Sequence, residues 1–427
     1  MRPCRQSQTP VRIRHFLLAS SHLNTASSPI RSNTISTIST GEAYVLHLAS
    51  LDGNYAVMSS GPSSSNSSGS NENTTCPIYL YSKRTLQREY TLPGHGISST
   101  FMRVVDSIAG LGRPVLVSSG KDGSVKVWDE RSRGCGIKMT DLGKSRAFLS
   151  FDVSLDGYTL AAGTELQGED ASVLYWDPRQ PNTPLRTHTS THSDDITAVH
   201  FSPSRPGVLL TASSDGLISL SNSDELDEDE AVINVGNWGC SISQAGWLSN
   251  GSHIWCASDM ETFSTWSEEL DLIQSHDIRA PCLHSGARTW VTDYLITASP
   301  SSSSITGDLD IFVGSNEGDV ALLSNSSLMF SQTSAEWSLH KLWSTGHEGI
   351  VRSLLWDAQD QVLVTGGEDG KICVWPGLSP GGLGGGRGVP LEDDPMDVDS
   401  SHNTKRARTG DMDWDAENRK NDKRSRR

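Results

Sequence analysis

The 427-residue sequence lacks the features that mark membrane-spanning proteins and disulfide-rich secreted domains. No apolar run approaches the ~18–20 residues that a bilayer-spanning helix needs. The seven cysteines are scattered, odd in number and include no Cys-x-x-Cys pair, a pattern typical of reduced thiols in an intracellular protein. No long amphipathic segment of helical period occurs in the middle of the chain. These absences exclude a membrane-spanning helix and favour an intracellular protein with little helix.

Motifs for cofactors and metals are also missing. The sequence contains no His-Glu-x-x-His and no Cys/His spacing suited to zinc. The glycine-containing stretch 110–120 is followed by Lys121 and then Asp122 rather than Ser or Thr, so it is not a phosphate-binding loop. The sequence therefore predicts neither a cofactor nor a metal. The net charge of −16 argues against direct nucleic-acid binding, except weakly through a basic tail.

A recurring supersecondary unit is what the sequence does contain. Residues 118–131 read as a strand, a tight Asp-Gly turn and a second strand that ends on Trp-Asp, and residues 365–375 repeat this pattern. In each copy the turn Asp precedes the Trp by six residues. Each copy also follows a Gly-His pair, Gly94-His95 and Gly346-His347. Such a repeat indicates a β-propeller.

Seven blades of about 40–45 residues need roughly 300 residues, which leaves room for tails and long loops. We therefore predict an all-β, seven-bladed propeller over residues 42–376, with disordered tails on both sides. Residues 1–41 form a basic Ser/Arg-rich arm with five Arg and no acidic residue. This arm resembles a mitochondrial transit peptide, and a disordered arm is the alternative. Residues 32–40 have β-propensity and could close the last blade as an added strand.

Polar residues at fixed places in the repeat form candidate hydrogen-bonded tetrads. A buried His, a strand Ser or Thr, a turn Asp and a Trp can satisfy one another in a low-dielectric interior. The complete sets are His95, Ser118, Asp122, Trp128 and His347, Thr365, Asp369, Trp375, and a partial set is His192, Thr211, Asp215. A hydrolase triad uses the same residue types. The structural interpretation is favoured because the set recurs and no Gly-x-Ser-x-Gly elbow accompanies it.

The remaining blades depart from this pattern. Blade 3 ends on Trp176, and blade 4 has Ser221 where Trp is expected. Blade 5 keeps Trp266 with altered spacing, and blade 6 has Leu323 in the Trp position. The acidic run 224–230 (DELDEDE) is predicted to be a solvated loop, and a docking site for a basic partner is the alternative.

These repeats resemble the WD-repeat family of β-propellers over residues 42–377, with specific copies in blades 2, 3, 4 and 7. Long segments, among them SFDVSLDGYTLAAGTE and GHEGIVRSLLWDAQDQVLVTGGEDG, are similar to one subfamily of these proteins. The resemblance implies a non-catalytic propeller that organises protein complexes. It also implies proteins or peptides as partners on the propeller faces.

Two consecutive blades contain the motif Trp-Asp-x-Arg, in which the arginines are Arg131 and Arg179. In propellers that are substrate receptors of cullin-RING ubiquitin ligases, a similar motif supports docking to the ligase adaptor. The planar guanidinium fork suits such a contact. The alternative is that each Arg pairs locally with the Asp before it.

Exposed ends of the repeat suggest further partner-binding residues, for which Lys121, Arg352 and Glu368 are candidates because loops from several blades converge there. The tail 377–427 changes from Gly-rich to acidic and then to basic. Its basic clusters predict a nuclear address, with the cytoplasm as the alternative and the mitochondrion less favoured; the residues are Lys405, Arg406, Arg408, Lys423, Arg424, Arg426 and Arg427. We expect a monomer within a larger complex.

Overall fold

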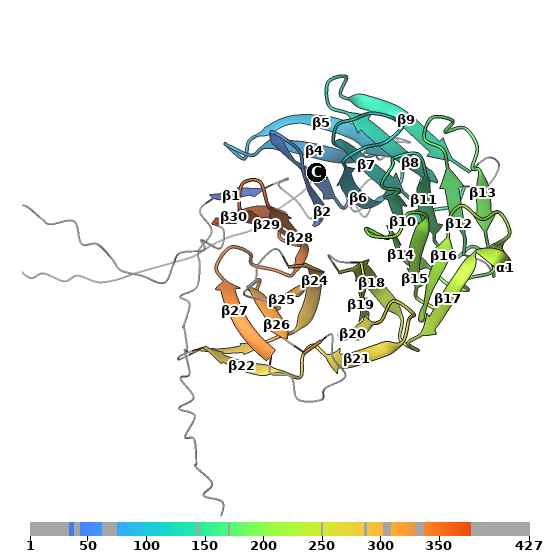
Figure 1. The fold of residues 1–427 in the computed structure, drawn as a ribbon. Helices are drawn as coiled ribbons and strands as arrows, with labels where there is room; N and C mark the ends of the chain where they lie inside the picture. Colours follow the sequence, from blue (N-terminus) through green and yellow to red (C-terminus); the bar gives the residue numbers. More distant parts are fainter. Residues whose placement is uncertain are drawn as a thin grey trace, which may run out of the picture. The chain divides into compact units, whose positions relative to one another are not determined.

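The computed structural model describes residues 34–37, 43–61, 75–141, 145–169, 171–248, 251–285, 288–301, 309–325, 327–328 and 337–376. The chain divides into two units, Met1–Leu378 and Ser379–Arg427, and every described residue lies in the first. This unit is an all-β propeller of seven four-stranded antiparallel sheets arranged around a central axis (Figure 1). The predicted fold class is confirmed.

Blades 1 to 3 each contain four consecutive strands, which run from the axis outwards. Their bounds are β2 (Val45–Ser50), β3 (Asn54–Ser59), β4 (Cys76–Ser82) and β5 (Arg88–His95); β6 (Ser99–Val105), β7 (Val115–Gly120), β8 (Ser124–Asp129) and β9 (Gly134–Thr140); β10 (Phe148–Val153), β11 (Leu160–Thr164), β12 (Val173–Trp176) and β13 (Arg186–His188).

Blades 4 to 6 repeat this order. Their strands are β14 (Ile196–Phe201), β15 (Val208–Ser213), β16 (Leu217–Asn222) and β17 (Val232–Asn237); β18 (Ile242–Trp247), β19 (Ile254–Ser258), β20 (Thr262–Trp266) and β21 (Leu272–Asp277); β24 (Tyr294–Pro300), β25 (Leu309–Gly314), β26 (Val320–Asn325) and β27 (Trp337–Trp343).

Blade 7 joins the two ends of the described chain. It contains β28 (Val351–Asp357), β29 (Val362–Gly367) and β30 (Lys371–Pro376), and β1 (Thr34–Thr37) completes it as the fourth strand. β1 pairs antiparallel with β30, with Thr34 opposite Val374. The strand lies within the segment 32–40 from which a closing strand was predicted, and Figure 1 shows it beside β30. The ring is therefore closed by backbone hydrogen bonds between distant parts of the sequence.

The middle strands of the blades are buried on both faces, because each blade packs between two neighbours. β7 and β25 are buried along their whole length, whereas outer strands such as β17 alternate between half-buried and exposed residues. The largest fully buried side chains include five indoles, one from each of five blades: Trp128, Trp176, Trp266, Trp343 and Trp375. The core is thus a ring of inter-blade layers rather than one central cluster.

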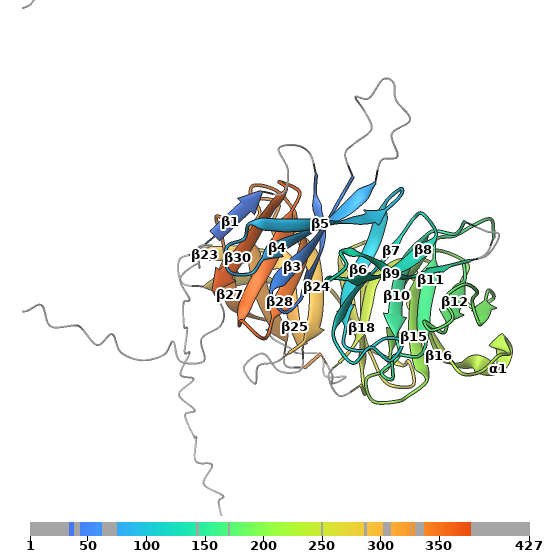
Figure 2. The same ribbon diagram turned by 90° about the horizontal axis from the view of Figure 1, so that it is seen from above.

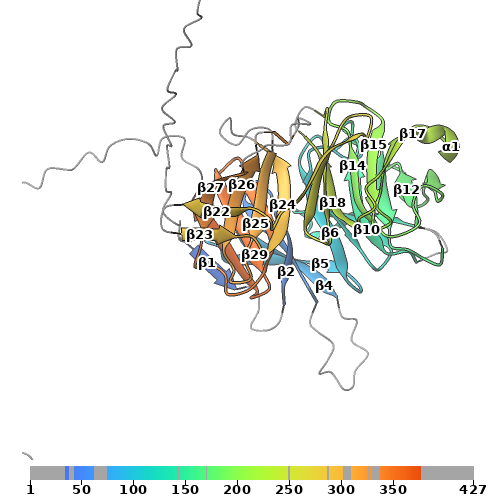
Figure 3. The same cartoon turned by 90° about the horizontal axis from the view of Figure 1, so that it is seen from below.

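Antiparallel connectivity places the strand connections on the two opposite faces of the propeller, one at each end of its axis. Figures 2 and 3 show these faces edge-on. We call the upper face the one with the turns between second and third strands and the links between blades. The lower face has the turns between first and second and between third and fourth strands. Residues that are distant in sequence meet on each face, because seven blades contribute to both.

Two elements lie outside the blades and were not anticipated from the sequence. A two-stranded hairpin of β22 (Cys282–Ser285) and β23 (Arg288–Val291) precedes blade 6 and lies against β27. A one-turn helix, α1 (Glu228–Ala231), precedes β17 at the outer edge of blade 4 (Figure 1). No helix of the described residues is long and apolar enough to cross a membrane.

Candidate interaction faces

The tetrad of blade 2 forms one continuous hydrogen-bonded chain. The His95 ring lies 2.9 Å from Asp122 through Nδ1 and 2.8 Å from the Ser118 hydroxyl through Nε2. The Trp128 indole donates to the same Ser118 Oγ at 2.8 Å. His95 and Ser118 are completely buried. The carboxylate requires a proton on Nδ1, so Ser118 accepts from the indole and donates to Nε2.

Blade 7 reproduces this geometry. His347 lies 3.1 Å from Asp369 and 2.8 Å from the Thr365 hydroxyl, which accepts from the Trp375 indole at 2.8 Å. Asp369 also accepts from two backbone N–H groups, those of Glu348 and Lys371. Burial raises the pKa of the Asp369 carboxyl, but the His347 ring and these N–H groups outweigh burial and lower the pKa to about 2.

The Asp122 carboxylate of blade 2 is held in a similar way by a different set of donors. Burial raises its pKa, and hydrogen bonds from His95, Ser124 and the Gly96 N–H lower it well below its ordinary value. Lys126 Nζ adds an ion pair to Asp122 at 3.0 Å and donates to the Gly94 carbonyl. The carboxylates of both tetrads therefore stay ionised and fix the turn of each blade to the preceding link.

The tetrads of blades 3 and 4 are incomplete in different ways. In blade 4, His192 contacts Thr211 at 2.8 Å and lies 3.4 Å from Asp215. Ser221 pairs with Leu209, the register at which Trp128 pairs with Leu116 in blade 2. The predicted set is therefore assembled without an indole donor.

Blade 3 keeps the indole and lacks the acceptor. Trp176 pairs with Leu160, and Ala162 stands two residues further along β11, where Ser118 and Thr365 stand in their blades. As a result, the buried Trp176 Nε1 has no hydrogen-bond partner among the described residues. Asp170, which precedes Trp176 by the same six residues as the turn Asp of blades 2 and 7, lies outside the described residues.

The acidic run of blade 4 is not simply a solvated loop, so that prediction is wrong for one of its members. Glu228 accepts hydrogen bonds from the backbone N–H groups of Thr189, Ser190 and Thr191 at 2.7–2.9 Å, and from the Thr191 hydroxyl at 2.7 Å. Burial raises the pKa of Glu228, but these donors outweigh burial and lower it. Glu228 thus fixes the link between blades 3 and 4.

No local pattern predicts this role of Glu228, because Glu228 and its donors are almost forty residues apart in the sequence. A local signal was present only for α1 itself. Asp227 precedes the helix and its carboxylate accepts from the Asp229 N–H, as expected of an N-cap residue. Acidic residues in the first turn also suit the helix dipole.

The predicted residues of the upper face are held in ion pairs. Lys121 contacts Glu165 of blade 3 at 2.7 Å, and Arg352 contacts Glu368 at 2.6 Å within blade 7. The structure brings Arg352 and Glu368 together but places Lys121 on a different blade. Such half-exposed pairs contribute little to stability and exchange readily for a partner's charges.

Arg352 also lines a cavity of about 590 Å³ that the inner strands enclose around the axis. His47, His200, Phe101 and Trp255 contribute to its wall. Burial lowers the pKa of both His47 and His200 to about 4, so both rings are neutral at pH 7. No group of residues that could hold a metal ion is present among the described residues.

On the lower face, the two Trp-Asp-x-Arg arginines differ. Arg179 forms a bidentate pair with Asp177, with contacts of 2.7–3.1 Å, and its guanidinium lies 4.5 Å from the Tyr158 ring centroid. The Arg131 side chain is 80% exposed and lies 3.6 Å from Asp129, which Arg113 holds at 2.9 Å. Local pairing thus accounts for Arg179 and leaves Arg131 largely in solvent.

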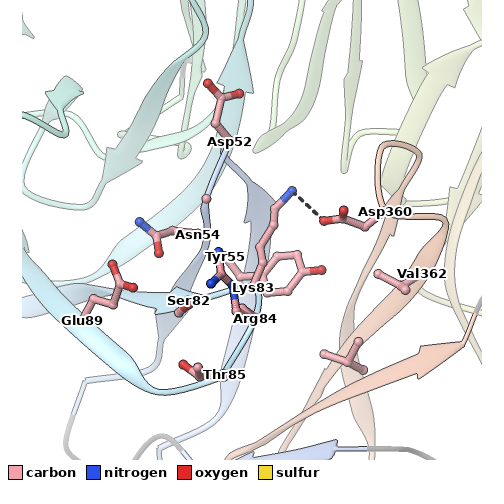
Figure 4. A pocket seen from close by; sticks show the side chains of 12 residues that line it. Asp52, Asn54, Tyr55, Ser82, Lys83, Arg84, Thr85, Glu89, Asp360 and Val362 are labelled. Carbon is pink, nitrogen blue, oxygen red and sulfur yellow. Dashed lines mark ion pairs between the residues drawn. The ribbon is translucent and has the colours of Figure 1, made fainter.

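A second lower-face feature escaped the sequence analysis. A groove of about 750 Å³ lies between blades 1 and 7, and Lys83 extends across it towards Asp360 (Figure 4). Lys83 contacts the buried Asp357 at 2.8 Å and Asp360 at 3.3 Å, and Ser50 donates to Asp357 at 3.0 Å. This network spans the junction where the ring closes, so we assign it a structural role. Its partners are too far apart in sequence to form a motif.

The basic residues of the tail, Lys405, Arg406, Arg408, Lys423, Arg424, Arg426 and Arg427, lie outside the described residues. Their predicted nuclear role remains a prediction.

Comparison with known proteins agrees with this geometry. The family described as WD domain, G-beta repeat matches residues 86–129, 182–220 and 338–376. Each match begins at or just before the outer strand of one blade and ends in the third strand of the next, which explains why β1 is needed to complete the last blade.

Three curated proteins illustrate the similarity. WD repeat-containing protein GTS1 of Arabidopsis thaliana is 31% identical, covering 71% of this chain and 76% of that protein. An uncharacterized WD repeat-containing protein of Saccharomyces cerevisiae, YNL035C, is 34% identical over 64% of this chain and 67% of its own. A WD repeat-containing protein 89 homolog of Dictyostelium discoideum is 26% identical over 61% and 67%. This last protein represents the subfamily to which the long repeat segments are similar.

Proposed function

The chain belongs to the WD-repeat family, and we propose that it is a non-catalytic scaffold that joins proteins within a nuclear complex. A protein-interaction scaffold is the role that the WD-repeat relatives and the propeller fold support. The nuclear setting rests on the basic clusters of the tail. Ribosome assembly is the process we propose, because an acidic propeller with a basic tail suits a chain that works among basic proteins.

One observation carries the non-catalytic part of this proposal. The Ser118 and Thr365 hydroxyls are buried, and each is engaged by an indole and an imidazole of its own blade. A nucleophile needs a free approach for its substrate, which these hydroxyls lack. The charged side chains of Lys121 and Arg352 are instead exposed on the upper face, where a partner can reach them, and Glu368 is half-buried in its pair with Arg352.

Affinity purification of the tagged full chain from nuclear and cytoplasmic fractions, followed by mass spectrometry, tests the proposal. We expect precursor ribosomal particles in the nuclear fraction. Recovery of the chain alone from both fractions would contradict a scaffold role. The nuclear address is tested separately by fusing residues 400–427 to a fluorescent reporter, where a diffuse whole-cell signal would reject it.

A substrate receptor of a cullin-RING ubiquitin ligase is the second candidate. The observation that favours it is the exposure of Arg131, which leaves one guanidinium of the Trp-Asp-x-Arg pair available to an adaptor. The double variant Arg131→Ala/Arg179→Ala is then expected to lose adaptor and cullin from the purified material.

The matched control for that variant is Arg279→Ala. Arg279 makes the same two-residue pair with Asp277, with contacts of 2.9–3.1 Å, but follows no Trp-Asp. It should retain every partner. Adaptor and cullin recovered equally with both variants, or absent from the wild type, would exclude the receptor function.

A further inference from the structure

The outer strand of blade 4 differs from the other outer strands in the side chains it exposes. Ile233 is 45% and Val235 is 52% exposed, and the register of β17 on β16 shifts at Ile233, which pairs with no residue of β16. On the face opposite Val235, a Cβ at Gly236 would meet Leu270 and Trp266 of blade 5 at 3.2 Å. The exposed face therefore points away from blade 5, towards the blade 3 side.

The short outer strand of blade 3 explains why this face is bare. β13 has three residues, whereas β17 has six. β17 is the terminal strand of its sheet, and no described strand pairs with its outer edge. An unpaired edge presents free N–H and C=O groups and is usually protected by charged side chains. Here β-branched apolar side chains take their place.

The sequence around β17 carries charge of one sign, and the half-buried Arg186 of β13 interacts electrostatically with Asp224 and Glu225. Between Arg205 and Arg279 the sequence contains no Lys or Arg. The acidic run immediately precedes β17, and Asp224, Asp229 and Glu230 are exposed and form no ion pair with described residues. Leu226, in the middle of the run, is 73% exposed. Glu228 is hydrogen-bonded to the link between blades 3 and 4. These bonds hold the backbone of the acidic run in place, and with it the exposed carboxylates.

We propose that β17 and the preceding acidic run, together called the blade 4 edge, bind an extended segment of a partner protein by β-strand addition. The partner segment contributes alternating apolar side chains that pack on Ile233 and Val235. Lys or Arg residues at one end of the segment contact the acidic run. Backbone hydrogen bonds supply affinity, and the apolar and basic positions supply specificity. The inference adds a docking site to the proposed scaffold and rests on that function only in requiring a protein partner.

A synthetic probe separates this test from the identity of any complex. The probe is a fluorescein-labelled peptide in which alternating Val, Ile and Thr residues are followed by Lys-Arg-Lys, and its affinity for the full chain is measured by anisotropy. A second peptide with Ser in place of Val and Ile measures attraction by charge alone. The apolar probe should bind at least about tenfold more tightly than the second peptide.

The variant Ile233→Lys/Val235→Lys should weaken probe binding by about tenfold or more, because lysines on the edge oppose strand addition and repel the basic end. Asp229→Asn/Glu230→Gln should weaken it by about threefold and reduce its salt dependence. Leu272→Lys is the matched control, since Leu272 is equally exposed on the outer strand of blade 5; it should bind like the wild type.

Circular dichroism checks that the variants fold. We expect them to fold because the substituted positions lie on the surface of the protein. Equal binding of the two peptides would overturn the proposal, since only charge would then be recognised. Unchanged affinity in the Ile233→Lys/Val235→Lys variant would overturn it as well. An equal loss of affinity in Leu272→Lys would also contradict the proposal, because the outer strand of blade 5 would then matter as much for probe binding as that of blade 4.

Discussion

Blade 2 and blade 4 have the same four-strand frame but use its polar positions differently. Blade 2 has the complete tetrad of His95, Ser118, Asp122 and Trp128, and its outer strand exposes no large apolar side chain. Blade 4 lacks the indole, has an acidic helical turn before its outer strand and exposes Ile233 and Val235. In blade 2 the repeat residues stabilise the blade, whereas blade 4 departs from the pattern and carries the surface that we propose for a partner.

The largest expected effect is the loss of the blade 2 indole. Trp128→Ala removes a fully packed side chain and leaves Ser118 without its donor, which should lower the free energy of unfolding by about 3–5 kcal/mol. Ser221→Ala at the same register of blade 4 should cost less than about 1 kcal/mol. Urea unfolding followed by tryptophan fluorescence measures both. Similar losses of unfolding free energy in the two variants would show that blades 2 and 4 do not differ at this position.

Glu228 gives the next effect, inside the acidic run itself. Glu228→Ala leaves three backbone N–H groups without their acceptor and should lower the free energy of unfolding by about 2–3 kcal/mol. Glu230→Ala, two residues on, should change it by less than about 0.5 kcal/mol because Glu230 is exposed. Equal effects would show that the run acts only through its total charge.

The depressed pKa of Asp369 predicts a stability loss in acid. The ordinary value is 3.8 and the folded value is about 2, so the folded protein binds fewer protons between these pH values. Stability from this group is complete above about pH 4 and disappears as pH falls through about 2, an effect of about 2 kcal/mol. Asp369→Asn should therefore lose less stability than the wild type between pH 5 and pH 2. If the unfolding free energies of the two proteins fell in parallel with pH, the lowered pKa of Asp369 would be refuted.

The smallest effect is expected for the Trp-Asp-x-Arg arginines. Arg179→Ala breaks a surface pair and should change the unfolding free energy by less than about 0.5 kcal/mol. Arg131→Ala should change it even less, because this side chain is mostly in solvent. A loss above about 1 kcal/mol in either variant would mean that the motif stabilises the blade rather than serving a partner.

The repeated features and the closing strand β1 were predictable from the sequence, whereas single contacts between distant residues were not. The spacing from Asp122 to Trp128 and from Asp369 to Trp375 identified the propeller and its two complete tetrads, because a local pattern recurs wherever a blade needs it. The bonds of Glu228 to residues 189–191 and of Lys83 to Asp357 were not predictable. Each joins residues far apart in sequence, and no periodicity records which partner the fold brings close.

The exposed edge of blade 4 was also beyond the sequence. The exposure of β17 depends on the short β13 of the neighbouring blade, which no pattern within 232–237 records. The run expected to be a solvated loop contains an ordered helical turn, in which Glu228 accepts hydrogen bonds from the link between blades 3 and 4. Local pattern therefore determines the strands, and the packing of neighbours determines which of them remain accessible.

Amide hydrogen exchange of the full chain, with and without the apolar basic probe, tests the difference between blades 2 and 4 most directly. Peptides that cover Val232–Asn237 should gain protection when the probe is bound, while those that cover Gly134–Thr140 of blade 2 should exchange unchanged. Equal protection of both outer strands, or protection confined to other segments, would contradict the assignment of partner binding to the blade 4 edge.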